Sequence, residues 1–295
     1  MLASVILCTY NRVRLLERAL RSLARQTAAS EQFEIIVVDD GSTDGTAELC
    51  TRAGRDLPNL NHIAMGKNSG LAAAGNRGIR SARGEFLLFI DDDCIAQENW
   101  VRHLAAALEQ HPIAAGAIQS PVSNYIKFCH NISQFHPFMK RRAEGWARSI
   151  AGANMGIRRS VLEELGGFDE KSQVPDMDLL FRAWSQGHRV HFAPNAVVIH
   201  DPDRTNLATV LQIASEHASN MILLRNRYGS FLRTPFALRS PQLILLAAPL
   251  IALAGTLGIY LNNAGLLPYF WTAPLVYAQK LAWCWGAARG LKKNR

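Results

Sequence analysis

The chain has 295 residues, 48% hydrophobic and 19% charged, which suits one sizeable globular domain with an additional segment. Its formal charge of +8 comes from residues 206–295, which hold nine Lys and Arg against a single acid, Glu216. This charge lies beside apolar stretches and not beside an aromatic stacking surface, which argues against a nucleic-acid-binding protein and favours a membrane partner. The five cysteines have no metal-binding spacing, which excludes a cysteine-based zinc site and fits a reducing compartment.

The N-terminal part of the chain alternates short apolar runs with helical patterns. The runs have the continuous apolar character of buried parallel strands, and they cover residues 4–7, 33–38, 61–64 and 86–90. Helical patterns follow at about 12–23, 44–53, 71–82 and 98–110, the first with Asn11 as its predicted N-cap. This repeated alternation predicts an α/β fold with a doubly wound, mainly parallel sheet flanked by helices.

Residues 120–150 interrupt the alternation and are predicted to form a long loop, because aromatic and basic residues are mixed there without a clear period. Regular structure is predicted to resume with short helices at 160–165 and 178–185 and with strands at 191–192 and 196–199. We therefore expect one catalytic-type domain over residues 1–205.

The remainder of the chain is basic and apolar at the same time. Residues 206–239 predict a basic amphipathic helix with a linker, and residues 240–295 predict two hydrophobic helices with a basic tail. The stretch 241–261 carries no charge and is long enough to span a bilayer. A second uncharged stretch, 265–279, continues past Lys280.

Basic residues flank this hydrophobic pair on both sides, whereas the residues that connect the two stretches are uncharged. The positive-inside rule then predicts a transmembrane hairpin with both ends, and the domain of residues 1–205, on the cytoplasmic side of the inner (plasma) membrane. Lys280 and the prolines at 249, 268 and 274 leave open an alternative, a hairpin that lies in the membrane interface without crossing it.

Three adjacent carboxylates, Asp91, Asp92 and Asp93, follow the apolar run 86–90. Such carboxylates repel one another unless a cation is present, and ligands of open α/β sheets bind beyond the carboxyl ends of the strands. In an extended backbone Asp91 and Asp93 would lie on one side and Asp92 on the other. The pair suits Mn²⁺ or Mg²⁺ with diphosphate oxygens as further ligands, although a solvated acidic turn would have the same sequence.

Polar residues also follow the first two predicted strands, namely Thr9, Tyr10 and Asn11 after one and Asp39 and Asp40 after the other. Because the carboxyl ends of parallel strands share one edge of a sheet, these clusters and the aspartate triplet are expected to converge on one ligand. A nucleotide diphosphate fits them. The glycine-rich dinucleotide and P-loop fingerprints are absent from the sequence, so binding of the diphosphate is expected to depend on the metal.

These motifs make the chain resemble the family 2 glycosyltransferases of the GT-A fold, a Rossmann-like nucleotide-diphospho-sugar transferase fold. The matching segments occur in the order typical of the family and extend from residue 4 to about residue 200. They are residues 5–12, 35–46, 68–78, 89–93, 152–155, 166–169 and 176–179.

The resemblance implies a role for each matching residue. It implies contacts to the nucleotide-sugar donor from Thr9, Tyr10, Asn11, Arg12, Asp39, Asp40, Lys67, Asn76, Asp91 and Asp92. It implies metal binding by Asp93 and His200, and a position on the acceptor side for Asn154, Gly167, Phe168 and Asp178. Members of the family invert the anomeric centre with one general base, and Asp176 matches that base.

The chain departs from the family pattern at two positions. Pro175 stands where a second acid usually precedes the base, which leaves Asp178 as an alternative base. Gly75 stands where an arginine usually precedes Asn76, and Arg77 is a candidate replacement for that diphosphate contact.

The sequence thus predicts a metal-dependent inverting glycosyltransferase that moves a sugar from a nucleotide-diphosphate donor to an acceptor hydroxyl. The hydrophobic tail suggests a lipid-linked saccharide or a glycolipid as acceptor, as in synthesis of cell-surface polysaccharide. The alternatives are a catalytically inactive, membrane-bound relative that acts as a scaffold, which Pro175 would favour, and a sugar nucleotidyltransferase. The nucleotidyltransferase would need a glycine-rich basic loop after the first strand, and residues 8–12 do not provide one.

Overall fold

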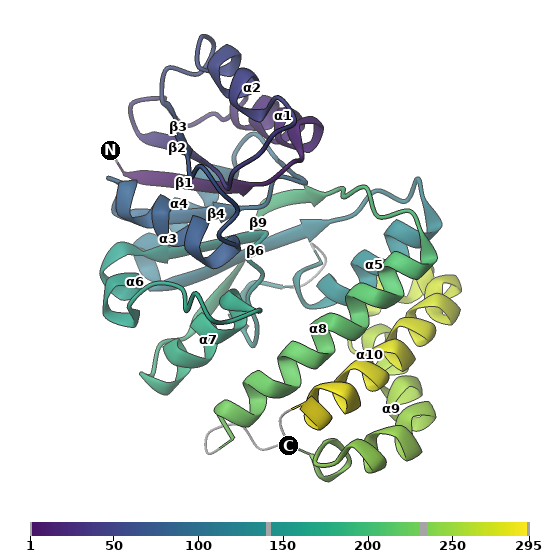
Figure 1. Ribbon diagram of the computed structural model, residues 1–295. Coiled ribbons are helices and arrows are strands. Elements are labelled where there is room, and N and C mark those ends of the chain that lie inside the picture. Colours follow the sequence, from purple (N-terminus) through teal and green to yellow (C-terminus); the bar gives the residue numbers. More distant parts are fainter. Residues whose placement is uncertain (1, 140–142, 230–234, 294–295) are drawn as a thin grey trace. The chain divides into compact units, whose positions relative to one another are not determined.

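The computed structural model describes residues 2–139, 143–229 and 235–293, and the chain divides into two compact units. The first unit, Met1–Gln119 with Pro137–Pro202, contains a sheet flanked by helices (Figure 1). The second unit, Ser120–His136 with Asp203–Arg295, is helical. The main division at Pro202 lies close to the boundary expected at residue 205, but residues 120–136 belong to the helical unit.

Four parallel strands form one half of a nine-stranded sheet, in the order β3-β2-β1-β4. Their bounds are Ala3–Thr9 for β1, Phe33–Asp39 for β2, Leu60–Ala64 for β3 and Phe86–Ile90 for β4. Every residue of β2 and β4 is buried, as their continuous apolar sequences predict. Thr9 lies opposite Asp39, so the polar residues that follow these strands emerge at one edge of the sheet.

The other half of the sheet makes it mixed. The path continues through β8 (Asn154–Arg158), β6 (Ile113–Gln119), β9 (Val190–His200) and β5 (Cys94–Ala96), and β7 (Gly145–Ala147) pairs with β9. The pairs β4–β8, β6–β8, β5–β9 and β7–β9 are antiparallel, whereas β6–β9 is parallel. The predicted parallel character therefore describes β1 to β4, because strand direction in the later part depends on long-range pairing.

The predicted helices of the first unit are confirmed to within a few residues. They are α1 (Val13–Leu23), α2 (Thr46–Ala53), α3 (Leu71–Ser81), α4 (Trp100–Gln110), α6 (Arg159–Leu165) and α7 (Pro175–Ser185). The two predicted late strands are one strand, β9, whose register against β6 shifts between Gly116 and Ala117. This irregularity accommodates Pro194, which cannot donate a ladder hydrogen bond.

Asn11 is not the N-cap of α1, and that prediction was wrong. Arg12 occupies the N-cap position, while Asn11 takes a left-handed backbone conformation with φ of 52°. The first backbone N–H of the helix, that of Val13, donates instead to Oδ2 of Asp44 at 2.8 Å. A carboxylate from the loop after β2 therefore caps the helix that follows β1.

The second unit consists of helices. They are α5 (Tyr125–Phe135), α8 (Leu207–Arg227), α9 (Pro241–Leu261) and α10 (Ala273–Lys293), with the 3-10 segments η1 (His136–Phe138), η2 (Phe236–Leu238) and η3 (Ala264–Thr272). Helix α5 lies where a long loop was predicted. Its apolar period is weak because the buried face includes His130 and Asn131, and Asn124 caps its start by accepting the Lys127 N–H at 3.0 Å.

Helices α8 and α10 lie side by side at close range (Figure 1). A Cβ atom on Gly286 would lie 1.9 Å from the carbonyl oxygen of Ser215, and one on Gly290 would lie 2.7 Å from that of Ser219. Glycine four residues apart on one helix, facing small residues on the other, lets two backbones approach in this way. Ala218, Ile222, Ala287 and Ala288 complete the buried core between them.

Within the described residues, α9 is the one helix that is long and apolar enough to cross a membrane. Only 28% of its most apolar window is buried, and leucines such as Leu246, Leu250 and Leu261 are mostly exposed. The second predicted hydrophobic segment is divided between η3 and α10, and Lys280 of α10 donates to the backbone oxygen of Ser133 at 3.1 Å.

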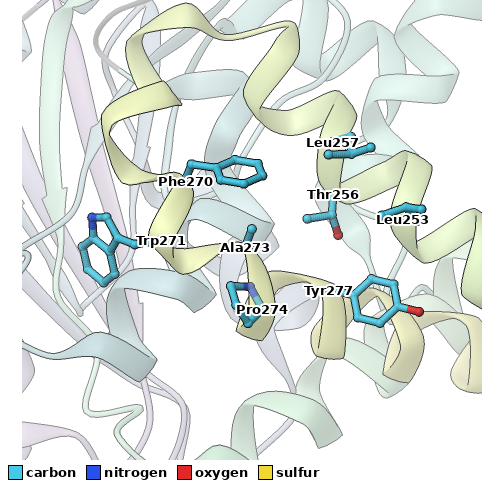
Figure 2. Close-up of a pocket in the computed structure, with 8 residues that line it drawn as sticks. All are labelled: Leu253, Thr256, Leu257, Phe270, Trp271, Ala273, Pro274 and Tyr277. Atoms are coloured by element: carbon cyan, nitrogen blue, oxygen red, sulfur yellow. The ribbon is translucent and has the colours of Figure 1, made fainter.

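An apolar cavity of about 450 Å³ opens between α9, η3 and the start of α10 (Figure 2). It is lined by Leu253, Thr256, Leu257, Phe270, Trp271, Ala273, Pro274 and Tyr277. The hydroxyl of Thr256 donates to the backbone oxygen of Ala252, so it offers the cavity little polarity. Phe270 and Trp271 are each about half exposed, with relative exposures of 49% and 50%.

Candidate active site

The loops after β1 and β2 are bound to each other at the carboxyl edge of the sheet. The backbone N–H of Asn11 donates to Oγ of Ser42 at 2.9 Å, and Oδ1 of Asn11 accepts the Thr43 N–H at 2.8 Å. Asn11 was predicted to contact the donor, yet its side chain is used in this loop contact. Tyr10, beside it, is 43% exposed and is free to face a ligand.

Asp39 and Asp40 are both buried but have different surroundings. Oδ1 of Asp39 accepts the Ser42 N–H at 2.8 Å, and Oδ2 lies 3.7 Å from Nε2 of His62. The two oxygens of Asp40 accept the N–H groups of Ser69 and Gly70, each at 2.8 Å, just before α3. Asp40, which was expected to contact the donor, therefore holds a loop in place.

Lys67 belongs to the loop that Asp40 holds, and its side chain is exposed. This loop packs against Gly41, where φ is +84° and an added Cβ would lie 2.7 Å from the carbonyl carbon of Lys67. Only glycine fits such a position, so Gly41 and Asp40 together fix the place from which Lys67 extends.

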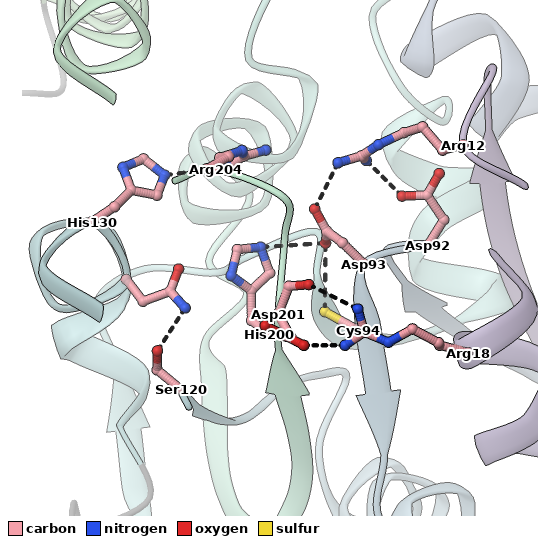
Figure 3. Close-up of polar contacts among 11 residues, drawn as sticks. Arg12, Arg18, Asp92, Asp93, Cys94, Ser120, His130, His200, Asp201 and Arg204 are labelled. Atoms are coloured by element: carbon pink, nitrogen blue, oxygen red, sulfur yellow. Dashed lines mark hydrogen bonds and ion pairs between the residues drawn. The ribbon is translucent and has the colours of Figure 1, made fainter. Parts of the chain in front are cut away.

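Residues Asp91–Asp93 form a turn and not a continuation of β4, since the Cys94 N–H donates to the Asp91 oxygen at 3.1 Å. The expected alternation of the three side chains is therefore wrong. One guanidinium, that of Arg12, contacts both Asp92 and Asp93: Nη1 lies 2.5 Å from Oδ1 of Asp92, and Nη2 lies 3.0 Å from Oδ2 of Asp93 (Figure 3). Thr9 donates to the other oxygen of Asp92 at 2.8 Å.

His200 and Asp93 are brought together by the pairing of β5 with β9, in which Cys94 lies opposite His200. Nε2 of His200 lies 3.3 Å from Oδ1 of Asp93, and both side chains are 2% exposed. The Asp201 N–H donates to the backbone oxygen of Asp93 at 2.9 Å. Arg18 of α1 forms an ion pair with the carboxylate of Asp201, which ties this turn to the helix (Figure 3).

The ion pair of Arg18 with Asp201 was not predicted. The sequence offered one signal, since Asp201 directly follows His200, which was singled out. Nothing local pointed to Arg18, because its partner lies in a distant part of the chain and the two meet only in the folded sheet.

The aspartates at this edge of the sheet raise the pKa values of the groups around them. Burial lowers the pKa of Arg12, but the nearby carboxylates of Asp92 and Asp93 outweigh it, so the pKa is raised above its ordinary value and the guanidinium stays charged. Burial, with the charges of Asp91, Asp40 and Asp92, raises the pKa of the Cys8 thiol. Burial together with the charge of Asp93 also raises that of Cys94. Both cysteines are therefore protonated thiols in the metal-free protein.

The residues present fit a divalent metal in a limited way. No group of three or more His, Cys, Asp or Glu side chains in the described parts of the chain is arranged to hold a metal by itself. Asp93 and His200 offer two ligands, one of them a carboxylate. Mg²⁺-type sites commonly use one or two carboxylates and complete the shell with substrate phosphates and water. The pair therefore fits a metal that shares its ligands with a diphosphate.

Asp176 lies in the first turn of α7. Its Oδ1 accepts the Met177 N–H at 2.8 Å, and its Oδ2 accepts the Gly152 N–H at 3.2 Å. Pro175 takes the first helical position, where proline is favourable because its missing N–H would have no intrahelical partner. The side chain is partly exposed, so a substrate hydroxyl can reach it.

Asp178, the alternative base, is fully buried. Its Oδ2 accepts Nε of Arg182 at 2.8 Å, and Arg182 also donates to the backbone oxygens of Leu165 and Gly167. This carboxylate anchors the loop after α6 to α7. Asp178, which was expected on the acceptor side, is thus a buried partner of Arg182.

Asn154, which was expected on the acceptor side, is a core residue. It is completely buried, and its Oδ1 accepts the indole N–H of Trp100 at 2.8 Å. Its Nδ2 donates to the backbone oxygens of Ala117 and Ala196, each at 2.9 Å. The amide therefore joins β8, β6, β9 and α4, and both of its N–H groups are used within the fold.

Asn76 clamps the loop that carries Gly167 and Phe168. Its Oδ1 accepts the Phe168 N–H at 2.8 Å, and its Nδ2 donates to the Phe168 oxygen at 2.9 Å and to Glu170 at 3.0 Å. Asn76, which was expected to contact the donor, therefore has a structural role in this loop. They also explain Gly75, because a Cβ there would lie 2.9 Å from the Phe168 ring.

Comparison with known families decides the identity of this arrangement. The family model described as Glycosyl transferase family 2 matches residues 4–166, and that described as Glycosyl transferase family group 2 matches residues 86–288. The chain belongs to glycosyl transferase family 2. The resemblance found in the sequence is thereby confirmed.

Named relatives match parts of this chain. The glycosyltransferase AglE of Haloferax volcanii is 24% identical over 200 residues, which make up 67% of this chain and 66% of AglE. The uncharacterized glycosyltransferase YfnE of Bacillus subtilis is 30% identical over 186 residues, 61% of this chain and 45% of YfnE. The chain thus spans less than two thirds of the length of these relatives.

Solved glycosyltransferase structures share the fold. The mannosyltransferase PcManGT from Pyrobaculum calidifontis, in complex with GDP-Man and Mn²⁺, matches 99% of this chain and 88% of its own with a TM-score of 0.64 at 22% identity. Residues 1–349 of TarS from Staphylococcus aureus, in complex with UDP-GlcNAc, match 100% of this chain and 93% of their own with a TM-score of 0.55 at 19% identity. The predicted GT-A fold is therefore confirmed.

Proposed function

We propose that this glycosyltransferase is a metal-dependent, inverting enzyme that transfers a sugar from a nucleotide-diphosphate donor to a hydroxyl of a lipid-linked saccharide or glycolipid. The observation that carries the proposal is the buried pair of Asp93 and His200, 3.3 Å apart at the carboxyl edge of the sheet. Solved structures with this fold hold GDP-Man with Mn²⁺ in one case and UDP-GlcNAc in another. Mn²⁺ or Mg²⁺ is the proposed cofactor here.

The donor side of the proposed site consists of the loops after β1, β2 and β4. Tyr10 and Lys67 are exposed on these loops, and Arg12 is partly exposed, so all three can contact a nucleotide diphosphate. Asp39 lies at the end of β2, where a carboxylate is suited to a ribose hydroxyl or a base N–H. Thr9 donates a hydrogen bond to Asp92, and Asn11 and Asp40 fix the loops. These three residues are therefore proposed to position the groups that contact the donor.

Asp93 and His200 would hold the metal, which would stabilise negative charge on the leaving diphosphate when bound. Asp176 is proposed as the general base. The N–H groups of Met177 and Gly152 fix its carboxylate, which would accept the proton of the acceptor hydroxyl as the sugar is transferred. Because Asp178 is buried in an ion pair with Arg182, we favour Asp176 over it.

A membrane-associated acceptor is supported by the helical unit. Helix α9 exposes leucines along a charge-free length of 21 residues, and an apolar cavity of about 450 Å³ adjoins it (Figure 2). A patch of this kind on a water-soluble surface would promote aggregation, whereas a bilayer or a lipid chain would cover it. With the basic residues around it, this unit is proposed to place the enzyme at the cytoplasmic face of the inner membrane, with saccharides for the cell surface as products.

The inactive-scaffold alternative depends on Pro175, and the helix gives that residue another explanation. Proline at the first position of α7 is locally favourable, so the loss of the usual acid there does not require loss of catalysis. The nucleotidyltransferase alternative has no support from the glycosyl transferase family 2 match.

The test is a donor screen on detergent-purified protein. Release of nucleoside diphosphate would be followed from UDP-, GDP- and dTDP-sugars with Mn²⁺ or with EDTA, using membrane lipid extract or water-soluble saccharides as acceptors. We expect metal-dependent turnover of one donor with the lipid extract, lost in Asp93→Ala and Asp176→Asn and retained in the exposed control Asp56→Asn. Turnover with soluble acceptors alone would contradict the lipid assignment, and metal-dependent donor binding without turnover would favour the scaffold.

A further inference from the structure

We propose that Arg12 is an internal counter-ion that competes with the divalent metal for Asp93, so that the metal binds tightly only after the donor diphosphate has drawn Arg12 away. This inference deepens the proposed function and rests on its metal dependence. From the sequence, Arg12 was expected only to contact the nucleotide-sugar donor.

The competition follows from the positions of the two Asp93 oxygens. Oδ2 lies 3.0 Å from Nη2 of Arg12, and Oδ1 lies 3.3 Å from Nε2 of His200. His200 can share a metal with Asp93 as a second ligand, but a guanidinium cannot, since it has donors only and is always charged. A metal bound to either oxygen of Asp93 would therefore share this carboxylate with the Arg12 guanidinium. The two cations would repel each other.

Arg12 also has a reason to stay where it is while the donor is absent. Asp92 and Asp93 are adjacent and nearly inaccessible, with side-chain exposures of 3% and 2%, and two such carboxylates repel each other unless a cation lies between them. The guanidinium of Arg12 bridges the two and supplies that charge (Figure 3). The charge of Arg12 thereby offsets the repulsion between the two carboxylates in the metal-free protein.

The side chain of Arg12 is able to move away from the two carboxylates. It is 35% exposed, in contrast to the carboxylates beneath it, and it extends from the N-cap position of α1 and not from within a helix. Guanidinium groups bind phosphate through two parallel hydrogen bonds. An incoming diphosphate would therefore offer Arg12 a new anionic partner, while Thr9 continues to hold Asp92 at 2.8 Å. The exchange would free Asp93 for the metal.

The experiment measures Mn²⁺ binding to the detergent-purified full chain without donor, from the loss of the EPR signal of free aqueous Mn²⁺. The variants are Arg12→Met, Arg12→Lys and the control Arg14→Met, which removes an exposed charge from the first turn of α1. Removing a charge-assisted contact should tighten Mn²⁺ binding by about ten- to a hundredfold in Arg12→Met. Arg14→Met should change it by less than about twofold, because exposed charges are screened.

Arg12→Lys serves as the second variant if Arg12→Met does not fold. A single ammonium cannot bridge both carboxylates through separate nitrogens, so we expect this variant to bind Mn²⁺ several times more tightly than the wild type. Unchanged or weaker Mn²⁺ binding in the folded variants would overturn the proposal, as would the absence of Mn²⁺ binding from all of them.

A second readout tests the coupling to the diphosphate. Adding UDP or GDP should tighten Mn²⁺ binding strongly in the wild type and much less in Arg12→Met, where no displacement is needed. An equal effect in both proteins would also contradict the role of Arg12. If the donor screen shows metal-dependent turnover while Arg12 substitutions leave Mn²⁺ affinity unchanged, this inference fails and the proposed function stands.

Discussion

Nε2 of His200 lies 3.3 Å from Oδ1 of Asp93, in a place where each side chain is only 2% exposed. The two residues come from the end of β9 and from the turn between β4 and β5, and the antiparallel pairing of β5 with β9 brings them together. The pair is buried and its two residues come from distant parts of the chain, and it is the position proposed above for a metal shared with a diphosphate.

His200→Gln should therefore weaken Mn²⁺ binding in the presence of nucleoside diphosphate. The amide keeps much of the volume but is a poorer metal ligand than imidazole, and we expect a loss of at least about tenfold in Mn²⁺ affinity by EPR titration. His103→Gln is the matched control, since His103 is exposed on α4. Equal Mn²⁺ affinity in the wild type and His200→Gln would remove His200 from the metal site.

Asp176→Asn should separate catalysis from donor binding. The amide cannot accept the acceptor proton, so kcat should fall by about a hundred- to ten-thousandfold while the KM for the donor changes little. Steady-state kinetics with the donor identified by the screen would measure both constants, with Asp56→Asn as control. A parallel rise in the donor KM would instead place Asp176 in donor binding.

Asp178→Ala should act on stability and not on a chemical step. The substitution leaves Arg182 without its buried carboxylate partner, and loss of one member of a buried ion pair costs about 3–5 kcal/mol. The denaturation midpoint should fall accordingly, while the folded fraction keeps its kcat. A variant with unchanged stability and no activity would instead identify Asp178 as the general base and leave Asp176 with a structural role.

Two glycine substitutions in the helical unit should have opposite effects. Gly286→Ala places a Cβ 1.9 Å from the Ser215 oxygen of α8, and the forced separation of the helices should destabilise the protein by about 1–3 kcal/mol. Gly255→Ala in α9 meets nothing closer than a Lys280 carbon at 3.9 Å, and it should stabilise the helix by about 0.5–1 kcal/mol. Denaturation of both variants in the same detergent would compare them. Equal midpoints would argue against the close packing of α8 and α10.

Glu34 should contribute a pH-dependent part of the stability. Burial alone would raise its pKa, but hydrogen bonds from Ser4 and Arg83 more than offset it, so the pKa is lowered from its ordinary value of 4.5. Just below pH 4.5 the unfolded chain therefore binds more protons than the folded one. The stabilisation of the fold by ionised Glu34 is complete above that pH and is lost as the pH falls.

Glu34→Gln removes the titrating group and tests that contribution. Its denaturation midpoint should fall less than that of the wild type between about pH 5 and about pH 3. Parallel curves for the two proteins would exclude Glu34 as a source of the acid sensitivity. Glu31→Gln is a suitable control because Glu31 is exposed.

Much of the fold could be predicted from local patterns. The runs that became β1, β2 and β4 are continuously apolar, and such runs have few alternatives to a strand buried on both faces. Helix α9 begins at Pro241 and ends at Leu261, as its uncharged length predicts. Helix α5 was missed because the residues that it buries include His130 and Asn131, which give no apolar period.

For the candidate site, the sequence alone determined which residue types stand at the motif positions. They are the triplet Asp91–Asp93, Asp176 and His200, which are the candidates for metal binding and proton transfer. Tertiary structure decided which of the others remain available. Asp40, Asn76 and Asn154 are polar and match the same motifs, yet their hydrogen-bonding groups are used by backbone and side-chain atoms from other elements. Likewise, a turn places Asp92 and Asp93 on one guanidinium where an extended strand would have separated them. These outcomes depend on partners that are distant in sequence, and local composition and periodicity carry no information about such partners.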